Sequence, residues 1–219
     1  MILAAGRGER LRPLTDQTPK PLLQAGPHRL IEHHLYALAE AGIMDIVINV
    51  AHLGQKIIDT LGDGASYGVN ILYSDETGCV LETGGGIYKA LPLLQSDPFL
   101  VINGDIWTDM DLGRLPQSID SQAHLVLVKN PAHHPDGDFC LHEGCVANAV
   151  QGSQNWTFSG IGIYRHSLFD KCEAGRFALA GLLRSKFGQC EVNGEIYNGE
   201  WMDIGTTERL RLLSERLAD

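Results

Sequence analysis

The sequence contains no apolar run long enough to cross a membrane and no recognisable secretory signal. Its five cysteines are odd in number, and none of them belongs to a Cys-x-x-Cys pair. These absences argue against a membrane protein and against a secreted scaffold built on disulfides. We therefore expect a cytoplasmic protein with reduced thiols and no membrane partner.

Positive charge is also scarce, because 17 Lys and Arg stand against 27 Asp and Glu, for a net charge of -10. Nucleic-acid binding needs a basic face, so we expect no nucleic-acid partner. The balance is reversed near the start of the chain. Residues 7–20 carry the cations Arg7, Arg10, Arg12 and Lys20 against the acids Glu9 and Asp16. An acidic protein with one cationic segment suits a small anionic substrate.

That segment is a glycine-rich loop over residues 3–15, followed by Pro19-Lys20-Pro21. Gly6 and Gly8 let the backbone turn tightly, so that its N–H groups can surround an anion. A dinucleotide fingerprint would need a third glycine at position 11, which is Leu11. A Walker loop would need Gly-Lys-Ser/Thr, which does not follow. A basic structural turn is the remaining alternative.

The loop reads Leu-Ala-Ala-Gly-x-Gly-x-Arg-Leu-x-Pro-Leu-Thr and resembles the opening of the sugar-1-phosphate nucleotidyltransferase family. The resemblance implies that Arg10 and Lys20 are catalytic and neutralise phosphate charge. It implies a nucleotide-binding set of Ala5, Gly6, Gly8, Glu9, Arg10, Lys20, Gly85 and Asn103. Family members usually carry two or three residues before the position of Met1, so we expect either a clipped first strand or a mis-assigned start site.

Strand-like and helix-like segments alternate in the first half, which predicts an α/β fold. We expect a Rossmann-like, mostly parallel sheet with helices on both faces. The predicted helices are 30–41, 53–61, 87–94 and one from Thr206; the predicted strands are 46–50, 69–73, 99–105, 124–128, 138–141 and 157–164. With no long linker, residues 1–219 form a single domain, with a nucleotide-binding part over about 1–110 and a small β-rich sugar-binding part over about 111–205.

Two aspartates beside glycines are candidate metal ligands. Asp105 follows an apolar strand and Gly104, and Asp203 precedes Ile204-Gly205. A charge in such a place needs a compensating cation, and carboxylates with phosphate oxygens suit Mg²⁺. The resemblance likewise implies that Asp105 and Asp203 bind Mg²⁺. A Gly-Asp pair is otherwise an ordinary turn, and Asp109 and Asp111 look like turn and cap residues.

Residues 82–86, Glu-Thr-Gly-Gly-Gly, could let a flat ligand lie against the backbone or begin a helix. In the family this segment lies beside base and sugar, so Glu82 is a candidate substrate residue. The segment from Asn130 to Phe139 resembles the N-acetylmuramate α-1-phosphate uridylyltransferase branch, whose pattern is Asn-Pro-x-His-His-x-x-Gly-Asp-Phe. That branch implies substrate contacts by Asp138, Ser159 and Gly160.

The resemblance implies uridylyl transfer from UTP to N-acetylmuramic acid 1-phosphate, giving UDP-MurNAc and pyrophosphate in peptidoglycan recycling. The absence of a Ser/His/Asp or Cys/His set agrees, because a sugar phosphate arrives already ionised and needs no general base. The alternatives are a mannose-1-phosphate guanylyltransferase, a glucose-1-phosphate thymidylyltransferase and an inactive nucleotide-sensing module. A transition-metal site among residues 133–145 is a further alternative, although the spacing matches no common zinc pattern. Because the long C-terminal extension of many relatives is absent, we expect a monomer.

Overall fold

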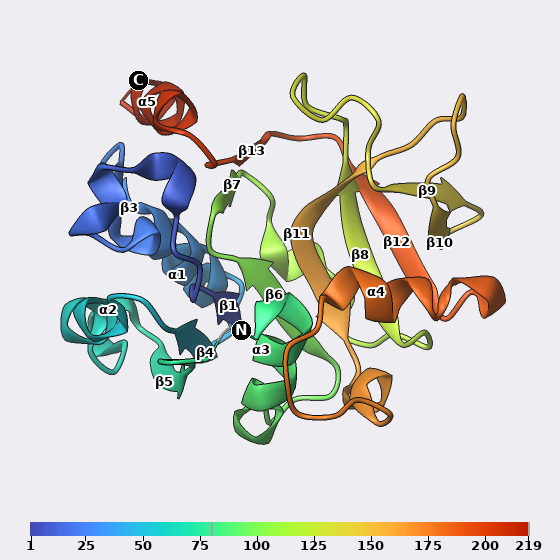
Figure 1. The fold of residues 1–219 in the computed structure, drawn as a ribbon, viewed down its shortest axis with the longest axis horizontal. Helices are drawn as coiled ribbons and strands as arrows, with labels where there is room; N and C mark the ends of the chain where they lie inside the picture. The colour runs from blue at the N-terminus through green and yellow to red at the C-terminus, as the bar shows by residue number, and fades with distance from the viewer. Residues whose placement is uncertain (80, 219) are drawn as a thin grey trace. The chain divides into compact units, whose positions relative to one another are not determined.

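The structure is a computed structural model that describes residues 1–79 and 81–218. Figure 1 shows its helices and strands, and its contacts divide the chain into two compact units. Unit 1 comprises Met1–Val80, Asn103–Leu115 and Glu200–Asp219, and unit 2 comprises Leu81–Ile102 and Pro116–Gly199. Within the described residues, no helix has the length and apolar character needed to span a bilayer. Treating the whole chain as one domain stays a prediction.

Unit 1 contains the parallel part of the fold. Strands β1 (Ile2–Leu3), β4 (Asp45–Val50) and β5 (Asn70–Asp75) lie in the order β5-β4-β1, and both pairings are parallel. Helix α1 (Leu30–Glu40) precedes β4, and helix α2 (Gly54–Leu61) lies between β4 and β5 in the chain. Five of the six residues of β4 are buried, as expected for an apolar strand covered on both faces. The predicted α/β character is confirmed here.

The rest of unit 1 contains two pairs of short antiparallel strands and one helix. Strand β2 (Gln24–Ala25) pairs with β3 (His28–Arg29), and β7 (Ile106–Thr108) pairs antiparallel with β13 (Trp201–Asp203). Helix α5 (Thr207–Arg216) follows β13. One buried apolar cluster joins these pieces to the glycine-rich loop, and it consists of Leu11, Leu23, Ala25, Leu30, Ile204, Leu210 and Leu213. The loop and the chain that carries Asp203 therefore share a core.

Unit 2 is richer in β-structure, as predicted. Its strands follow the order β6 (Phe99–Asn103), β11 (Thr157–Tyr164), β8 (Ala123–Val128), β12 (Val192–Tyr197), β10 (Cys145–Asn148) and β9 (Phe139–His142). Among these pairings β12 and β8 pair in parallel, and the other four are antiparallel. Helices α3 (Glu82–Ala90) and α4 (Leu179–Arg184) also lie in this unit.

Short 3₁₀ helices fill several connections. They are η1 (Glu9–Leu11), η2 (Leu14–Asp16), η3 (Lys20–Leu22), η4 (Ala65–Tyr67), η5 (Leu91–Leu93), η6 (Leu112–Arg114), η7 (His166–Phe169) and η8 (Phe187–Gln189). The predicted helix 87–94 is displaced, because α3 begins at Glu82 and ends at Ala90. Gly84 and Gly85 lie inside this helix because segment 175–177 packs too closely against them to leave room for a side chain. A Cβ on Gly84 would stand 2.5 Å from the ring of Phe177, and one on Gly85 would overlap the carbonyl oxygen of Gly175.

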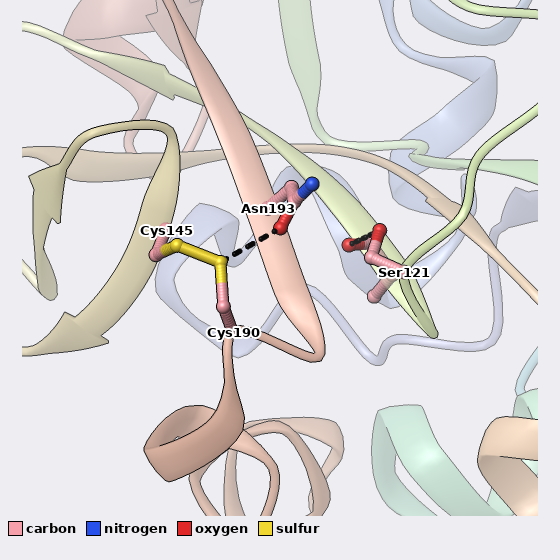
Figure 2. Close-up of a disulfide and its surroundings, with 5 residues drawn as sticks. Ser121, Cys145, Cys190 and Asn193 are labelled. Atoms are coloured by element: carbon pink, nitrogen blue, oxygen red, sulfur yellow. Dashed lines mark hydrogen bonds between the residues drawn. A yellow bond between two sulfur atoms is a disulfide. The ribbon is translucent and has the colours of Figure 1, made fainter.

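The expectation of reduced thiols is wrong for two cysteines. Cys145 in β10 and Cys190 form a disulfide with a Cα–Cα distance of 5.2 Å (Figure 2). Strand pairing brings them together, because Cys145 lies opposite Asn193 in the β10–β12 ladder and Cys190 lies just before β12. The two residues are 45 positions apart, so sequence spacing could not reveal the pair. Cys79, Cys140 and Cys172 are thiols.

Candidate active site

The glycine-rich loop turns at Gly8, which has a φ of +65°. The Thr15 hydroxyl donates a 2.9 Å hydrogen bond to the Gly8 carbonyl oxygen. A Cβ at position 8 would lie 2.9 Å from Thr15 Cγ2 and 3.1 Å from Lys20 Cβ. Both the backbone angle and the space therefore require glycine. The turn folds the loop back against Lys20.

A buried polar chain holds the start of this loop. The backbone N–H of Ala4 donates to Asn49 Oδ1 at 2.7 Å, and Asn49 Nδ2 donates to Glu76 Oε1 at 2.7 Å. Asn49 and Glu76 are each only 3% exposed. Buried polar groups whose hydrogen bonds are all formed favour a single local conformation, here that of the backbone at Ala4. Neither residue was predicted from the sequence, although a single Asn inside the apolar strand 46–50 was a usable signal.

Lys20 and Asp105 form the first ion pair of the site. Lys20 is 7% exposed, and its Nζ lies 2.7 Å from Asp105 Oδ2. The neighbouring Gly104 donates its N–H to the Leu3 carbonyl oxygen at 2.9 Å, and a Cβ there would stand 2.7 Å from that oxygen. Gly104 thus allows the end of β1 to approach the chain just before Asp105. The structure brings these two predicted residues into direct contact.

Asp203 and Arg209 form the second ion pair. Asp203 lies opposite Ile106 in the β13–β7 ladder, and the Ile204 N–H donates to the Asp105 carbonyl oxygen at 2.7 Å. The two predicted metal ligands are therefore neighbours along paired backbones. Arg209 Nη1 lies 2.7 Å from Asp203 Oδ1, and both side chains are mostly buried. Arg209 was not singled out in the sequence, because helical arginines are usually surface residues.

The donor chemistry of Asp105 and Asp203 fits Mg²⁺, which prefers carboxylate oxygens and keeps several ligands from water and phosphate. No cluster of three or more His, Cys, Asp or Glu able to hold a metal occurs in the described part of the chain. Two protein carboxylates agree with a magnesium site of this kind. The same finding does not support the transition-metal alternative at residues 133–145, where Cys145 is also bound in the disulfide.

The remaining nucleotide-binding candidates of unit 1 lie along the same loop or next to Gly104. Gly6 and Glu9 are exposed, Ala5 is half-buried, and Asn103 ends β6. Arg10 is exposed and reaches toward Gly205, where a Cβ would stand 3.0 Å from Arg10 Nη2. Asp111 caps η6, as predicted, whereas Asp109 is not the turn residue that was expected, because its carboxylate bonds the distant Glu200. The Oδ1 atoms of Asp109 and Asp111 accept the N–H groups of Glu200 and Gly113, at 2.7 and 3.0 Å.

The sugar-side candidates belong to unit 2. Glu82 has a φ of +58°, and its Oε1 lies 2.6 Å from Arg176 Nη2. Gly85 donates its N–H to the Phe177 carbonyl oxygen at 3.1 Å. The glycines of α3 therefore contact segment 175–177 of the chain itself. A nucleotide contact by Gly85 stays a prediction.

The motif around Asp138 stabilises its own loop. Asp138 Oδ1 lies 3.1 Å from His134 Nε2, and Oδ2 accepts the Phe158 N–H at 2.9 Å. Ser159 is 1% exposed, and Gly160 has a φ of +85° beside an irregularity of the β11–β8 pairing. The structure thus gathers the three predicted sugar-side residues 138, 159 and 160 at the start of β11. Their contact with substrate stays a prediction.

Comparisons with known proteins agree with this architecture. The profile of the family described as Nucleotidyl transferase matches residues 1–143. The chain is 54% identical over 218 residues to the N-acetylmuramate alpha-1-phosphate uridylyltransferase of Neisseria meningitidis, covering 96% of this chain and 94% of that protein. It is 30% identical over 220 residues to the mannose-1-phosphate guanylyltransferase catalytic subunit beta of Drosophila melanogaster, covering 94% of this chain and 58% of that protein.

Two solved structures share the fold. One is a Bacillus anthracis protein described as a glucose-1-phosphate thymidylyltransferase, with a TM-score of 0.85 and 21% identity, covering 100% of this chain and 94% of that one. The other is HddC from Yersinia pseudotuberculosis, with a TM-score of 0.82 and 23% identity, covering 98% of this chain and 97% of that one. These likenesses confirm the Rossmann-like fold. With a family profile that spans most of its length and a relative at 54% identity, the chain belongs to the nucleotidyl transferase family.

Proposed function

We propose that this enzyme transfers a uridylyl group from UTP to N-acetylmuramic acid 1-phosphate. The products are UDP-MurNAc and pyrophosphate. The observation that carries the proposal is the 54% identity, over nearly the whole length of both chains, to an N-acetylmuramate alpha-1-phosphate uridylyltransferase. The loop at Gly8 and the ion pairs of Lys20 and Arg209 support it, because they gather cations around two carboxylates.

In the proposed reaction, a phosphate oxygen of the sugar 1-phosphate attacks the α-phosphorus of UTP. The bond from that phosphorus to the oxygen bridging to the β-phosphate breaks, and pyrophosphate leaves with its electrons. The attacking phosphate is already ionised at neutral pH, since its second pKa is near 6. The protein therefore has to position two anions and to neutralise charge, and no general base is required.

In this proposal, the residues of unit 1 bind the phosphates and the metal. Arg10 and Lys20 would neutralise phosphate charge, and the backbone from Gly6 to Glu9 would surround the phosphates. Asp105 and Asp203 would hold Mg²⁺, which when bound screens the negative charge that develops on the phosphates. In unit 2, Glu82, Asp138, Ser159 and Gly160 would contact the sugar phosphate. We further propose a cytoplasmic monomer that acts in peptidoglycan recycling.

The test is pyrophosphate release in the presence of Mg²⁺, measured with UTP, CTP, GTP, ATP and dTTP against a panel of sugar 1-phosphates. We expect release with UTP and N-acetylmuramic acid 1-phosphate, and at least about ten times less with the GTP and mannose 1-phosphate pair. Preferred use of GTP with mannose 1-phosphate, or of dTTP with glucose 1-phosphate, would replace the proposed substrates. No release with any pair would identify a nucleotide-sensing module without turnover.

A further inference from the structure

Two guanidinium groups meet at Gly205, which is buried in unit 1. A Cβ on this glycine would overlap Arg209 Nη2 and would lie 3.0 Å from Arg10 Nη2. Both arginines therefore approach the same small region of backbone. The absence of a side chain at position 205 gives them the room to do so.

The position of Arg209 is fixed from several sides. Its backbone N–H donates to the Thr206 hydroxyl at the start of α5, at 3.3 Å. Its side chain is 16% exposed, and its Nη1 lies 2.7 Å from Asp203 Oδ1. A long side chain held in this way loses little further conformational freedom when it binds a ligand. This arginine is thus preorganised, unlike an ordinary surface arginine.

Two guanidinium groups and one carboxylate meet in this region. Arg10 and Arg209 contribute two positive charges at Gly205, and Asp203 contributes one negative charge to this group. Lys20 and Asp105 compensate each other, since they form their own pair. Like charges held close together repel, and a ligand with several negative charges removes that repulsion. Guanidinium groups suit phosphate oxygens in particular, because their N–H donors match phosphate geometry.

We propose that Arg209 is a further substrate-binding residue, which with Arg10 binds the pyrophosphate part of the nucleoside triphosphate. The inference rests on the proposed function for the identity of the ligand. The ion pair with Asp203 holds the guanidinium in place before the ligand arrives. Asp203 then keeps Arg209 near the phosphates while its carboxylate serves the metal. Arg209 belongs to α5 and lies far along the chain from segment 7–20, which carries the predicted cations Arg10 and Lys20.

The test measures binding of inorganic pyrophosphate, UTP and UMP by isothermal titration calorimetry, without divalent metal, for the wild type and for Arg209→Gln and Arg209→Lys. Arg211→Gln is the matched control, because Arg211 lies on the same helix and forms an exposed pair with Glu215. We expect Arg209→Gln to weaken pyrophosphate and UTP binding about 10- to 100-fold, the usual effect of losing hydrogen bonds to a charged group. Arg209→Lys should lose less, and UMP binding should change less than about threefold.

Three results would overturn the inference. One is equal pyrophosphate binding by Arg209→Gln and Arg211→Gln, another is an equal loss for UMP and pyrophosphate, and the third is no pyrophosphate binding by the wild type. If Arg209→Gln does not fold, the comparison of Arg209→Lys with the wild type decides. The proposed function is tested separately by turnover. If the wild type turns over UTP but Arg209→Gln binds pyrophosphate as well as the wild type does, only this inference is refuted. If the wild type binds pyrophosphate through Arg209 but shows no turnover, only the proposed function is refuted.

Discussion

Acid should destabilise this protein through one buried histidine, His34. His34 lies on α1 in unit 1 and is 4% exposed, and its Nε2 has no hydrogen-bond partner within the described residues. The pKa of His34 is lowered from 6.5 to about 4, mainly by burial and to a smaller extent by the charge of His33. A backbone hydrogen bond to Ile106 and the charge of Asp105 raise it only in part. The imidazole is therefore neutral in the folded protein at physiological pH.

The sign of the pH dependence follows from these two pKa values. Between pH 6.5 and 4 the unfolded chain binds a proton at this position and the folded chain does not. The free energy of unfolding is therefore fully present above pH 6.5 and falls as the pH drops toward 4. At about 1.36 kcal/mol per pH unit, lowering the pH from 7.5 to 5 should remove about 2 kcal/mol through His34 alone.

Urea unfolding followed by tryptophan fluorescence, at pH 7.5, 6 and 5, measures this effect. His34→Asn keeps a short amide near the Ile106 backbone and removes the titrating group. We expect the variant to be less stable at pH 7.5 because of its smaller volume. Between pH 7.5 and 5, however, it should lose about 2 kcal/mol less than the wild type. His52→Asn, at an exposed position of the same unit, is the control and should follow the wild type. Parallel curves for His34→Asn and the wild type would refute the reasoning.

Three further predictions concern other parts of the molecule. Asp203→Asn should lower pyrophosphate release at least about 100-fold while the thermal midpoint changes little, whereas the exposed cap variant Asp111→Asn should keep its activity; comparable rates would remove Asp203 from the site. Gly85→Ala should lower the free energy of urea unfolding by about 1–3 kcal/mol, because the new methyl group meets the Gly175 carbonyl. Gly181→Ala, in α4 with open space around it, should instead raise it by about 0.5–1 kcal/mol, so a shift of the same sign in both variants would contradict the packing argument. Cys145→Ser should lower the free energy of unfolding by about 2–4 kcal/mol under non-reducing conditions, since the disulfide closes a loop across 45 positions. Excess reductant should abolish that difference from the wild type, and Cys172→Ser should show none.

The sequence predicted the parallel part of unit 1 well, because its strands are continuous apolar runs and its helices end at glycines. Strand β4 and helix α1 lie within one residue of their predicted bounds. The helix at α3 was placed five residues late, since three consecutive glycines indicate a loop when only local preference is considered. Their real constraint is the close approach of segment 175–177, which no local pattern contains.

At the site, local motifs identified residues but not their partners. Lys20 and Asp105 are 85 positions apart, and their contact depends on the approach of the Gly104 backbone to Leu3 within unit 1. Arg209 and Asn49 were missed because their side-chain partners lie outside the helix or strand that carries them, Asp203 for Arg209 and Ala4 and Glu76 for Asn49. The pair Cys145–Cys190 was missed for the same reason, since the β10–β12 register alone brings the two cysteines together.

The division of unit 1 into three stretches of chain has a consequence for protein synthesis. Asp105 and Lys20 leave the ribosome well before Asp203 and Arg209, because residues 116–199 are made in between and belong to unit 2. A nascent chain that has reached residue 199 can therefore carry half of the proposed metal site, but it has no β13 to pair with β7. Until that pairing forms, Asp105 keeps its ion pair with Lys20 but lacks the backbone contact with Ile204. Nucleotidyl transfer should accordingly be absent from stalled chains that stop short of residue 203, however well their earlier strands have folded.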